Sequence, residues 1–162
     1  MEKEFLQIIQ KNQGIIHKVC NIYCDTDDDR NDLFQEIVTQ LWRSFPSFRK
    51  ESKVSTWMYR VALNTAITNF KKSKRRPDQN HLTYENFQIE DEVYDHETEE
   101  QIKSLHRAVN HLTGVEKSII LLYLEDKKYE EIAEITGITQ NYVRVKMNRI
   151  KRKLKKRMDT ES

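Results

Sequence analysis

The sequence is short of the residues that make turns and cross-links. Among its 162 residues there are three glycines, two prolines and two cysteines. With so few turn residues, long helices become the expected element. No stretch shows the apolar–polar alternation between paired turn signals that predicts strands. The composition therefore predicts an all-α protein and argues against a sheet-based fold.

Long apolar runs and a secretion signal are also missing. No stretch approaches the ~18 consecutive apolar residues that a membrane span needs. The start, MEKEFLQIIQK, begins an amphipathic pattern and lacks the basic and apolar regions of a signal peptide. We therefore expect a cytoplasmic protein without membrane insertion. In that compartment Cys20 and Cys24 are predicted to be reduced, buried thiols, because no further cysteine could complete a metal site.

Charge is abundant, but it is unevenly distributed. Residues 1–76 contain 14 Lys/Arg and 9 Asp/Glu, and residues 102–162 contain 14 and 8. Residues 77–101 contain 9 Asp/Glu and no Lys/Arg. Two basic ends therefore flank an acidic middle, which indicates two nucleic-acid contacts joined by a segment that does not bind DNA.

Apolar residues spaced three and four apart predict seven helices. They span Lys3–Tyr23, Arg30–Ser44, Thr56–Lys74, Glu97–Leu112, Val115–Leu124, Tyr129–Ile135 and Thr139–Arg157. Residues 25–29, Ser55, Thr113 and Thr139 are the predicted helix caps. We expect two small helical domains, 1–76 and 97–162, joined by a flexible acidic linker over 77–96.

The stretch from Tyr129 to Leu154 has the order of a helix-turn-helix. A short helix, YEEIAEI, precedes the turn Thr136-Gly137-Ile138 and a long helix. Ala133 is small where the two helices would cross, and Gly137 tolerates the positive φ that a tight turn requires.

On a helical wheel, the long helix separates into two faces. Val143, Met147, Ile150 and Leu154 form one narrow apolar stripe. From Arg144 to Arg157 there are nine Lys/Arg and no acid, a pattern that attracts phosphates. A solvated basic surface is the alternative, but the preceding helix and turn favour DNA binding. The face predicted to contact base edges carries Asn141, Tyr142, Arg144, Val145, Asn148, Arg149 and Arg152.

The N-terminal part carries two further candidate surfaces. A polar edge of the second helix either docks a partner or is merely solvated; it contains Asp32, Gln35, Glu36 and Gln40. The third helix interleaves aromatic and cationic residues: Trp57, Tyr59, Arg60, Phe70, Lys71, Lys72, Lys74, Arg75 and Arg76. Aromatic rings can stack on unpaired bases while cations hold phosphates. The same rings equally fit a helical core, so both interpretations stay open.

These motifs together resemble a known family. The block DLFQEIVTQLW (32–42), the block STWMYRVALN (55–64) and the terminal helix-turn-helix occur in the order seen in extracytoplasmic-function sigma factors. The resemblance covers about Ile8 to Lys156. It implies a non-enzymatic, cofactor-free subunit that binds core RNA polymerase and directs transcription initiation through −10 and −35 promoter contacts. Three departures from the family pattern are visible. Thr68 stands where many members have Asp, Asn69-Phe70 replaces a more usual basic or aliphatic pair, and Val145 stands where the recognition helix often has Ser.

The resemblance also assigns residues to each contact. It implies core-polymerase docking, on the clamp helices of the largest subunit, by Asp32, Leu33, Gln35, Glu36 and Trp42. It implies −10 contacts by Trp57, Arg60, Asn64, Lys71 and Lys72. It implies −35 contacts by Gln140, Asn141, Tyr142, Arg144, Val145, Asn148 and Arg149. Further implied partners are the flap of the second-largest polymerase subunit, promoter DNA and an anti-sigma factor, with the free chain a monomer.

Two other functions are weighed against this. A stand-alone helix-turn-helix regulator would need a dimer and a symmetric operator. An enzyme acting on nucleic acid would use the aspartates of residues 25–29, or His106 with His111. The aspartates are better interpreted as a helix-start loop, and histidines five apart do not share a helix face.

Overall fold

The protein is built from helices, as the composition predicted. In the computed structural model, the described residues are 1–48, 53–74 and 96–161. Their elements are α1 (Glu2–Tyr23), α2 (Asp27–Ser44), the short 3-10 helix η1 (Phe45–Ser47), α3 (Val54–Lys74), α4 (His96–Asn110), α5 (Gly114–Leu124), α6 (Tyr129–Thr136) and α7 (Gln140–Glu161). The prediction of an all-α fold is confirmed. The predicted linker lies outside the described residues except for His96, which begins α4.

The starts of α2, α5 and α7 follow from capping chemistry. The Thr26 hydroxyl accepts a hydrogen bond from the Asp29 backbone N–H at 3.1 Å, and three aspartates in the first turn of α2 complement the helix dipole. The helix therefore begins at Asp27, earlier than the predicted Arg30. The prediction of Ser55 as a cap is wrong, because α3 begins at Val54 and the Trp57 N–H already bonds to the Lys53 carbonyl.

The helices α1, α2 and α3 pack into one N-terminal core. Ile16, Ile37 and Leu41 are fully buried between them. Ala62 and Ala66 of α3 are also fully buried, and their small side chains allow the neighbouring helices to approach closely. This core stabilises the fold, because burying each large aliphatic side chain contributes about 1.5–3 kcal/mol to the free energy of folding.

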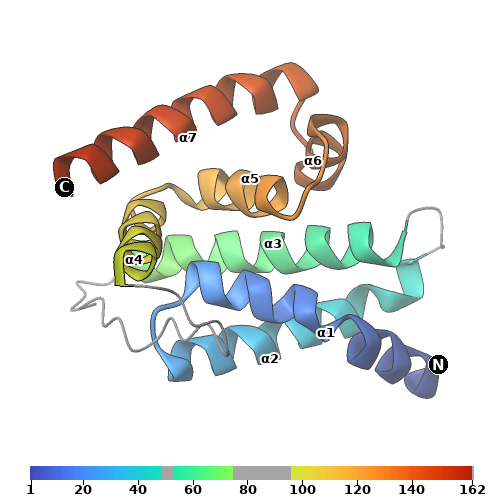
Figure 1. The fold of residues 1–162 in the computed structure, drawn as a ribbon. Coiled ribbons are helices and arrows are strands. Elements are labelled where there is room, and N and C mark those ends of the chain that lie inside the picture. The colour runs from blue at the N-terminus through green and yellow to red at the C-terminus, as the bar shows by residue number, and fades with distance from the viewer. Residues whose placement is uncertain (49–52, 75–95, 162) are drawn as a thin grey trace.

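The C-terminal helices pack against the N-terminal ones. Figure 1 shows α5 lying between α3 and α7, with α6 joining α5 to α7 at one end. Ile119, Leu122, Ile132, Met147 and Ile150 fill the space among α5, α6 and α7. The helix α5 therefore has two buried faces, which explains why its sequence is apolar nearly throughout.

The turn after α5 uses an aspartate in a conformation that favours glycine. Asp126 has φ of 62°, and the Lys127 N–H bonds to the Leu122 carbonyl at 3.0 Å. This six-to-one bond closes α5 in the manner of a Schellman motif. It directs the chain sharply into α6.

Candidate nucleic-acid and polymerase interfaces

The predicted helix-turn-helix is present in α6 and α7. Gly137 ends α6 with φ of 79° and ψ of 11°, and its N–H bonds to the Ala133 carbonyl at 2.9 Å. A Cβ at Gly137 would have no heavy atom within 4 Å, so the backbone conformation alone requires glycine there. The Thr139 hydroxyl accepts from the Tyr142 N–H at 3.1 Å and caps α7 as predicted.

The two predicted faces of α7 are both observed. Val143, Met147 and Ile150 are fully buried, and Leu154 is nearly so. The seven residues assigned to the −35 contact are all exposed: Gln140, Asn141, Tyr142, Arg144, Val145, Asn148 and Arg149. They form one surface of amide, guanidinium and apolar groups, which we call the recognition face. Such a face can hydrogen-bond base edges while the lysines that follow attract phosphates.

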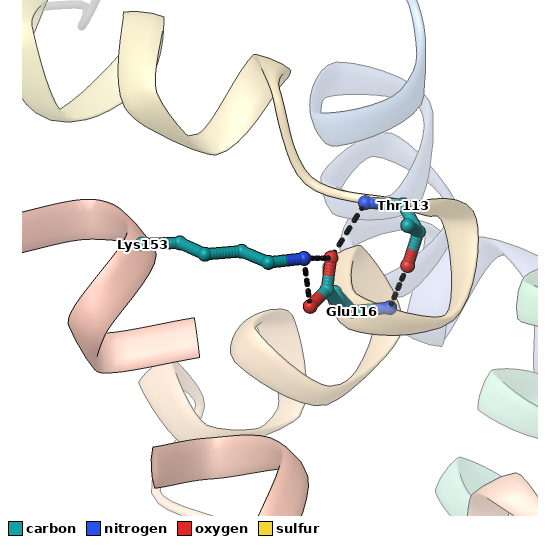
Figure 2. A network of polar contacts seen from close by, with 3 residues as sticks. All are labelled: Thr113, Glu116 and Lys153. Atoms are coloured by element: carbon teal, nitrogen blue, oxygen red, sulfur yellow. Dashed lines mark hydrogen bonds and ion pairs between the residues drawn. The ribbon is translucent and has the colours of Figure 1, made fainter. Parts of the chain in front are cut away.

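An ion pair between a buried glutamate and a half-exposed lysine fixes α7 against α5 (Figure 2). The Lys153 ammonium donates to both carboxylate oxygens of Glu116, at 2.8 and 2.7 Å. Glu116 also accepts from the Thr113 N–H at 2.9 Å, and its own N–H donates to the Thr113 hydroxyl at 3.2 Å, which completes a capping box. One carboxylate thus starts α5 and anchors α7. Lys153 is accordingly an internal contact rather than a phosphate ligand.

The ionised state of Glu116 is favoured by its partners. Burial alone would raise the pKa of this carboxyl, but the hydrogen bonds from Lys153 and Thr113 outweigh it, and the pKa lies below its ordinary value of 4.5. The position of the recognition helix therefore depends on a charged carboxylate.

The candidate docking edge of α2 is mostly exposed. Asp32, Gln35 and Glu36 all face solvent. Leu33 differs, because its side chain is 1% exposed in the core and can only hold the helix in place. Trp42 is 42% exposed and lies edge-on to Phe5, with ring centroids 4.9 Å apart. It is partly core and partly available surface.

The −10 candidates divide into two groups. Asn64, Lys71 and Lys72 are exposed on α3. Trp57 is buried and stacks on Phe48, with centroids 4.6 Å apart, so in this arrangement its ring has no room for a base. The core interpretation of Trp57 therefore holds for this conformation.

Arg60, the remaining −10 candidate, contacts the C-terminal helices. Its guanidinium donates to the Glu134 carbonyl of α6 at 3.0 Å. Close by, the Lys127 ammonium lies 5.9 Å from the ring centroid of Tyr59. Part of the predicted −10 surface is thus covered by α6. We call this contact of α1 and α3 with α5 and α6 the seam.

The centre of the seam contains a buried lysine. Lys117 is 3% exposed, donates to the Ile22 carbonyl at 3.2 Å and lies 4.7 Å from the ring centroid of Phe70. The Tyr23 hydroxyl donates to the Gly114 carbonyl at 2.5 Å. A Cβ on Gly114 would lie 3.2 Å from Phe70 Cδ1, so glycine permits the close approach of α5 to α3. The seam is specific rather than a loose apposition.

The residues of the seam, and Glu116, were not predicted from the sequence. One signal was available for Glu116, since Thr113-x-x-Glu116 is the capping-box pattern. A second was Lys117, a charge inside the apolar run VEKSIILLYL. Nothing local indicated Tyr23 or Arg60 as seam residues, because their partners lie 91 and 74 residues away.

Among the candidate residues of the alternative functions, Asp27 has a structural role. Asp27 pairs with Arg30 at 2.9 Å in the first turn of α2. Burial lowers the pKa of His106.

The two thiols are held in their protonated form. Burial raises the pKa of the Cys20 thiol to about 11 and that of the Cys24 thiol to about 12. Both cysteines are free, and Cys20 is buried as predicted while Cys24 is half-buried. Within residues 1–48, 53–74 and 96–161 there is no cluster of metal-ligating side chains and no helix long and apolar enough to cross a membrane.

Comparisons with known proteins cover nearly the whole chain. Residues 8–76 match the family description Sigma-70 region 2, and residues 102–154 match Sigma-70, region 4. The chain is 32% identical over 128 residues to RNA polymerase sigma factor SigV of Bacillus subtilis, covering 78% of this chain and 74% of the relative. It is 30% identical over 159 residues to the ECF RNA polymerase sigma-E factor of Haemophilus influenzae, covering 91% and 84%.

Two solved structures have a similar fold. Sigma factor RpoE in complex with the anti-sigma factor NepR, from Bartonella quintana, superposes with a TM-score of 0.71 at 16% identity, covering 99% of this chain and 98% of the other. CnrH in complex with the cytosolic domain of CnrY gives 0.70 at 13% identity, covering 100% and 92%.

Proposed function

The chain belongs to the extracytoplasmic-function sigma factors of the sigma-70 family and directs promoter-specific transcription initiation, and we propose which of its surfaces make each contact. The observation that carries the proposal is the recognition face of α7, where all seven predicted −35 residues are exposed opposite the buried stripe. Placed in the major groove, this face presents Asn141, Arg144 and Arg149 to base edges.

The −10 contact is assigned to α3. Asn64, Lys71 and Lys72 offer an exposed amide and two cations that suit a single strand held by its phosphates. Arg60 and Trp57 join them only after the seam opens, because one is bonded to α6 and the other is buried. Because this site binds unstacked bases, binding there favours opening of the duplex.

Core RNA polymerase is the proposed partner of α2, through Asp32, Gln35, Glu36 and the exposed part of Trp42, with Leu33 supporting them from the core. The C-terminal helices are proposed to contact the flap of the second-largest subunit. By separating the two groups of helices, the polymerase would set the distance between two individually weak DNA contacts, which then act as one through effective concentration. The chain acts by this coupling and makes or breaks no bond itself.

An anti-sigma factor is a proposed second partner. The two solved structures compared above, RpoE and CnrH, are complexes with another protein, and NepR, the partner of RpoE, is named an anti-sigma factor. A partner of that kind would be effective if it held the seam closed, since the closed seam covers Arg60. We further propose that the free chain is a monomer and works in the cytoplasm, where the polymerase is.

Run-off transcription with purified core polymerase on genomic fragments tests the proposal. The chain should form a stable complex with core and produce new start points, which map the promoters. Arg149→Ala should lower transcription from those promoters. Lys11→Ala removes an exposed cation of α1, outside every proposed contact, and should behave as the parent. A chain that neither bound core nor produced a new start point would refute the proposed function.

A further inference from the structure

Two side chains of the recognition face are apolar. Tyr142 is 44% exposed and Val145 is 39% exposed. Neither is needed by the core, which Val143, Met147 and Ile150 already fill. Single exposed apolar residues are ordinary on protein surfaces. The arrangement here is more specific, because these two lie among the amides and guanidinium groups of a DNA-reading helix.

The amides flank the valine on one stripe. Asn141 and Asn148 lie four residues before and three residues after Val145, so the three side chains share a helix face. The stripe is about 10 Å long at ~1.5 Å per residue, which matches about three base pairs at ~3.4 Å each. The Lys146 ammonium lies 5.6 Å from the ring centroid of Tyr142, at the edge of the stripe. A cation at that edge can attract a phosphate of the DNA backbone.

The order amide, apolar, amide along this stripe matches one set of groups in the major groove. An asparagine amide pairs with N6 and N7 of adenine, and apolar side chains contact the C5-methyl group of thymine. A G·C pair offers no methyl group there. We infer that Val145, with Tyr142 beside it, contacts a thymine methyl group in the −35 element, between adenines read by Asn141 and Asn148. The inference rests on the proposed function, because it specifies the DNA that the recognition face prefers.

The recognition face is available for this contact without rearrangement. The helix α7 packs on α4, α5 and α6, while the seam involves α1, α3, α5 and α6. Closing the seam therefore covers part of the −10 surface but leaves Val145 and its neighbours exposed. The base preference of α7 is a property of the closed and the separated chain alike.

Uracil substitution tests the inference. Uracil pairs as thymine does but lacks the methyl group. On a mapped promoter, each thymine of the −35 element, on both strands, is replaced singly by uracil, and run-off transcription is measured with core polymerase and the full chain at sub-saturating concentration. We expect one position at which uracil lowers transcription about fourfold, which corresponds to about 0.8 kcal/mol for one buried methyl group.

Variants assign the penalty to residues. In Val145→Ala the uracil penalty should fall below about twofold, because the side chain that contacted the methyl group is gone. Lys155→Ala removes an exposed cation of α7 outside the recognition face, and it should weaken transcription from all templates alike and keep the fourfold penalty. Transcription that is indifferent to uracil throughout the −35 element, or a penalty unchanged in both Val145→Ala and Tyr142→Ala, would overturn the methyl contact. Absence of any start point would instead overturn the proposed function.

Discussion

The bidentate pair between Glu116 and Lys153 should contribute measurably to stability. Glu116→Gln keeps an oxygen that can accept from the Thr113 N–H, since glutamine also serves in a capping box. It removes the charge that both contacts to Lys153 depend on. The matched variant Lys153→Met removes the ammonium and keeps the length of the side chain. Together with the double variant they form a double-mutant cycle.

The expected coupling follows from how the pair is placed. The Glu116 side chain is 1% exposed and that of Lys153 is 50% exposed. Hydrogen bonds to charged groups contribute about 1.5–3 kcal/mol when buried, whereas exposed pairs contribute about 0–1 kcal/mol. With one partner buried and the other half in water, we expect a coupling free energy of about 1–2 kcal/mol. Urea unfolding at pH 7, followed by far-UV circular dichroism, measures it.

The pH dependence supplies an independent check. Because the folded pKa of Glu116 is lowered, its contribution to stability is present above the unfolded value of 4.5 and is lost as pH falls through the folded value. The stability difference between the parent and Glu116→Gln should therefore be constant from pH 7 to about 5 and shrink below about 4. A coupling free energy below about 0.3 kcal/mol, or a difference independent of pH, would refute the reasoning.

Three further perturbations probe the seam, the turns and the thiols. Gly114→Val should separate α5 from α3, because even a Cβ lies 3.2 Å from Phe70, and small-angle scattering should report a larger radius of gyration. Gly14→Ala, whose Cβ meets nothing within 4 Å, is the control. Equal radii of gyration for the two variants would contradict the role of the seam. Gly137→Ala should lower the free energy of unfolding by about 1–2 kcal/mol, whereas Asp126→Gly should not lower it, because only glycine adopts a positive φ without cost. Thermal melting compares the two variants, and equal effects would contradict the backbone argument. Cys20, with a pKa of about 11, should react with iodoacetamide at pH 8 at least about 100-fold more slowly than a free thiol until the chain unfolds, and equal rates in the native and unfolded chain would contradict its burial.

Local chemistry made the helices and the recognition face predictable. The cap at Thr113, the turn at Gly137 and the stripe of α7 each depend on residues within a few positions of one another. Their spacing alone therefore decides which side chains are buried and which are exposed. Seven helices and both faces of α7 could be derived in this way, with ends that differ by a few residues.

The seam could not be derived, because it joins segments far apart in the chain. Lys18 pairs with Glu125 across 107 residues, and Lys117 bonds to Ile22 across 95. Such pairs depend on how two folded surfaces fit, and the charge pattern along the chain does not encode that fit. The same limit explains why the burial of Trp57 stood only as one of two open interpretations, and why the bond from Arg60 to α6 could not be anticipated.

The buried lysine of the seam affects how tightly the chain binds a partner that recognises only molecules with a separated seam. If closed molecules outnumbered separated ones about 100 to 1, a partner that recognises only separated molecules would bind about 100-fold more weakly than its intrinsic affinity. Each contact of Lys117 with Ile22 and Phe70 raises that ratio. Substitutions far from any DNA or polymerase contact would then set how much of this protein is needed in a cell before its genes respond.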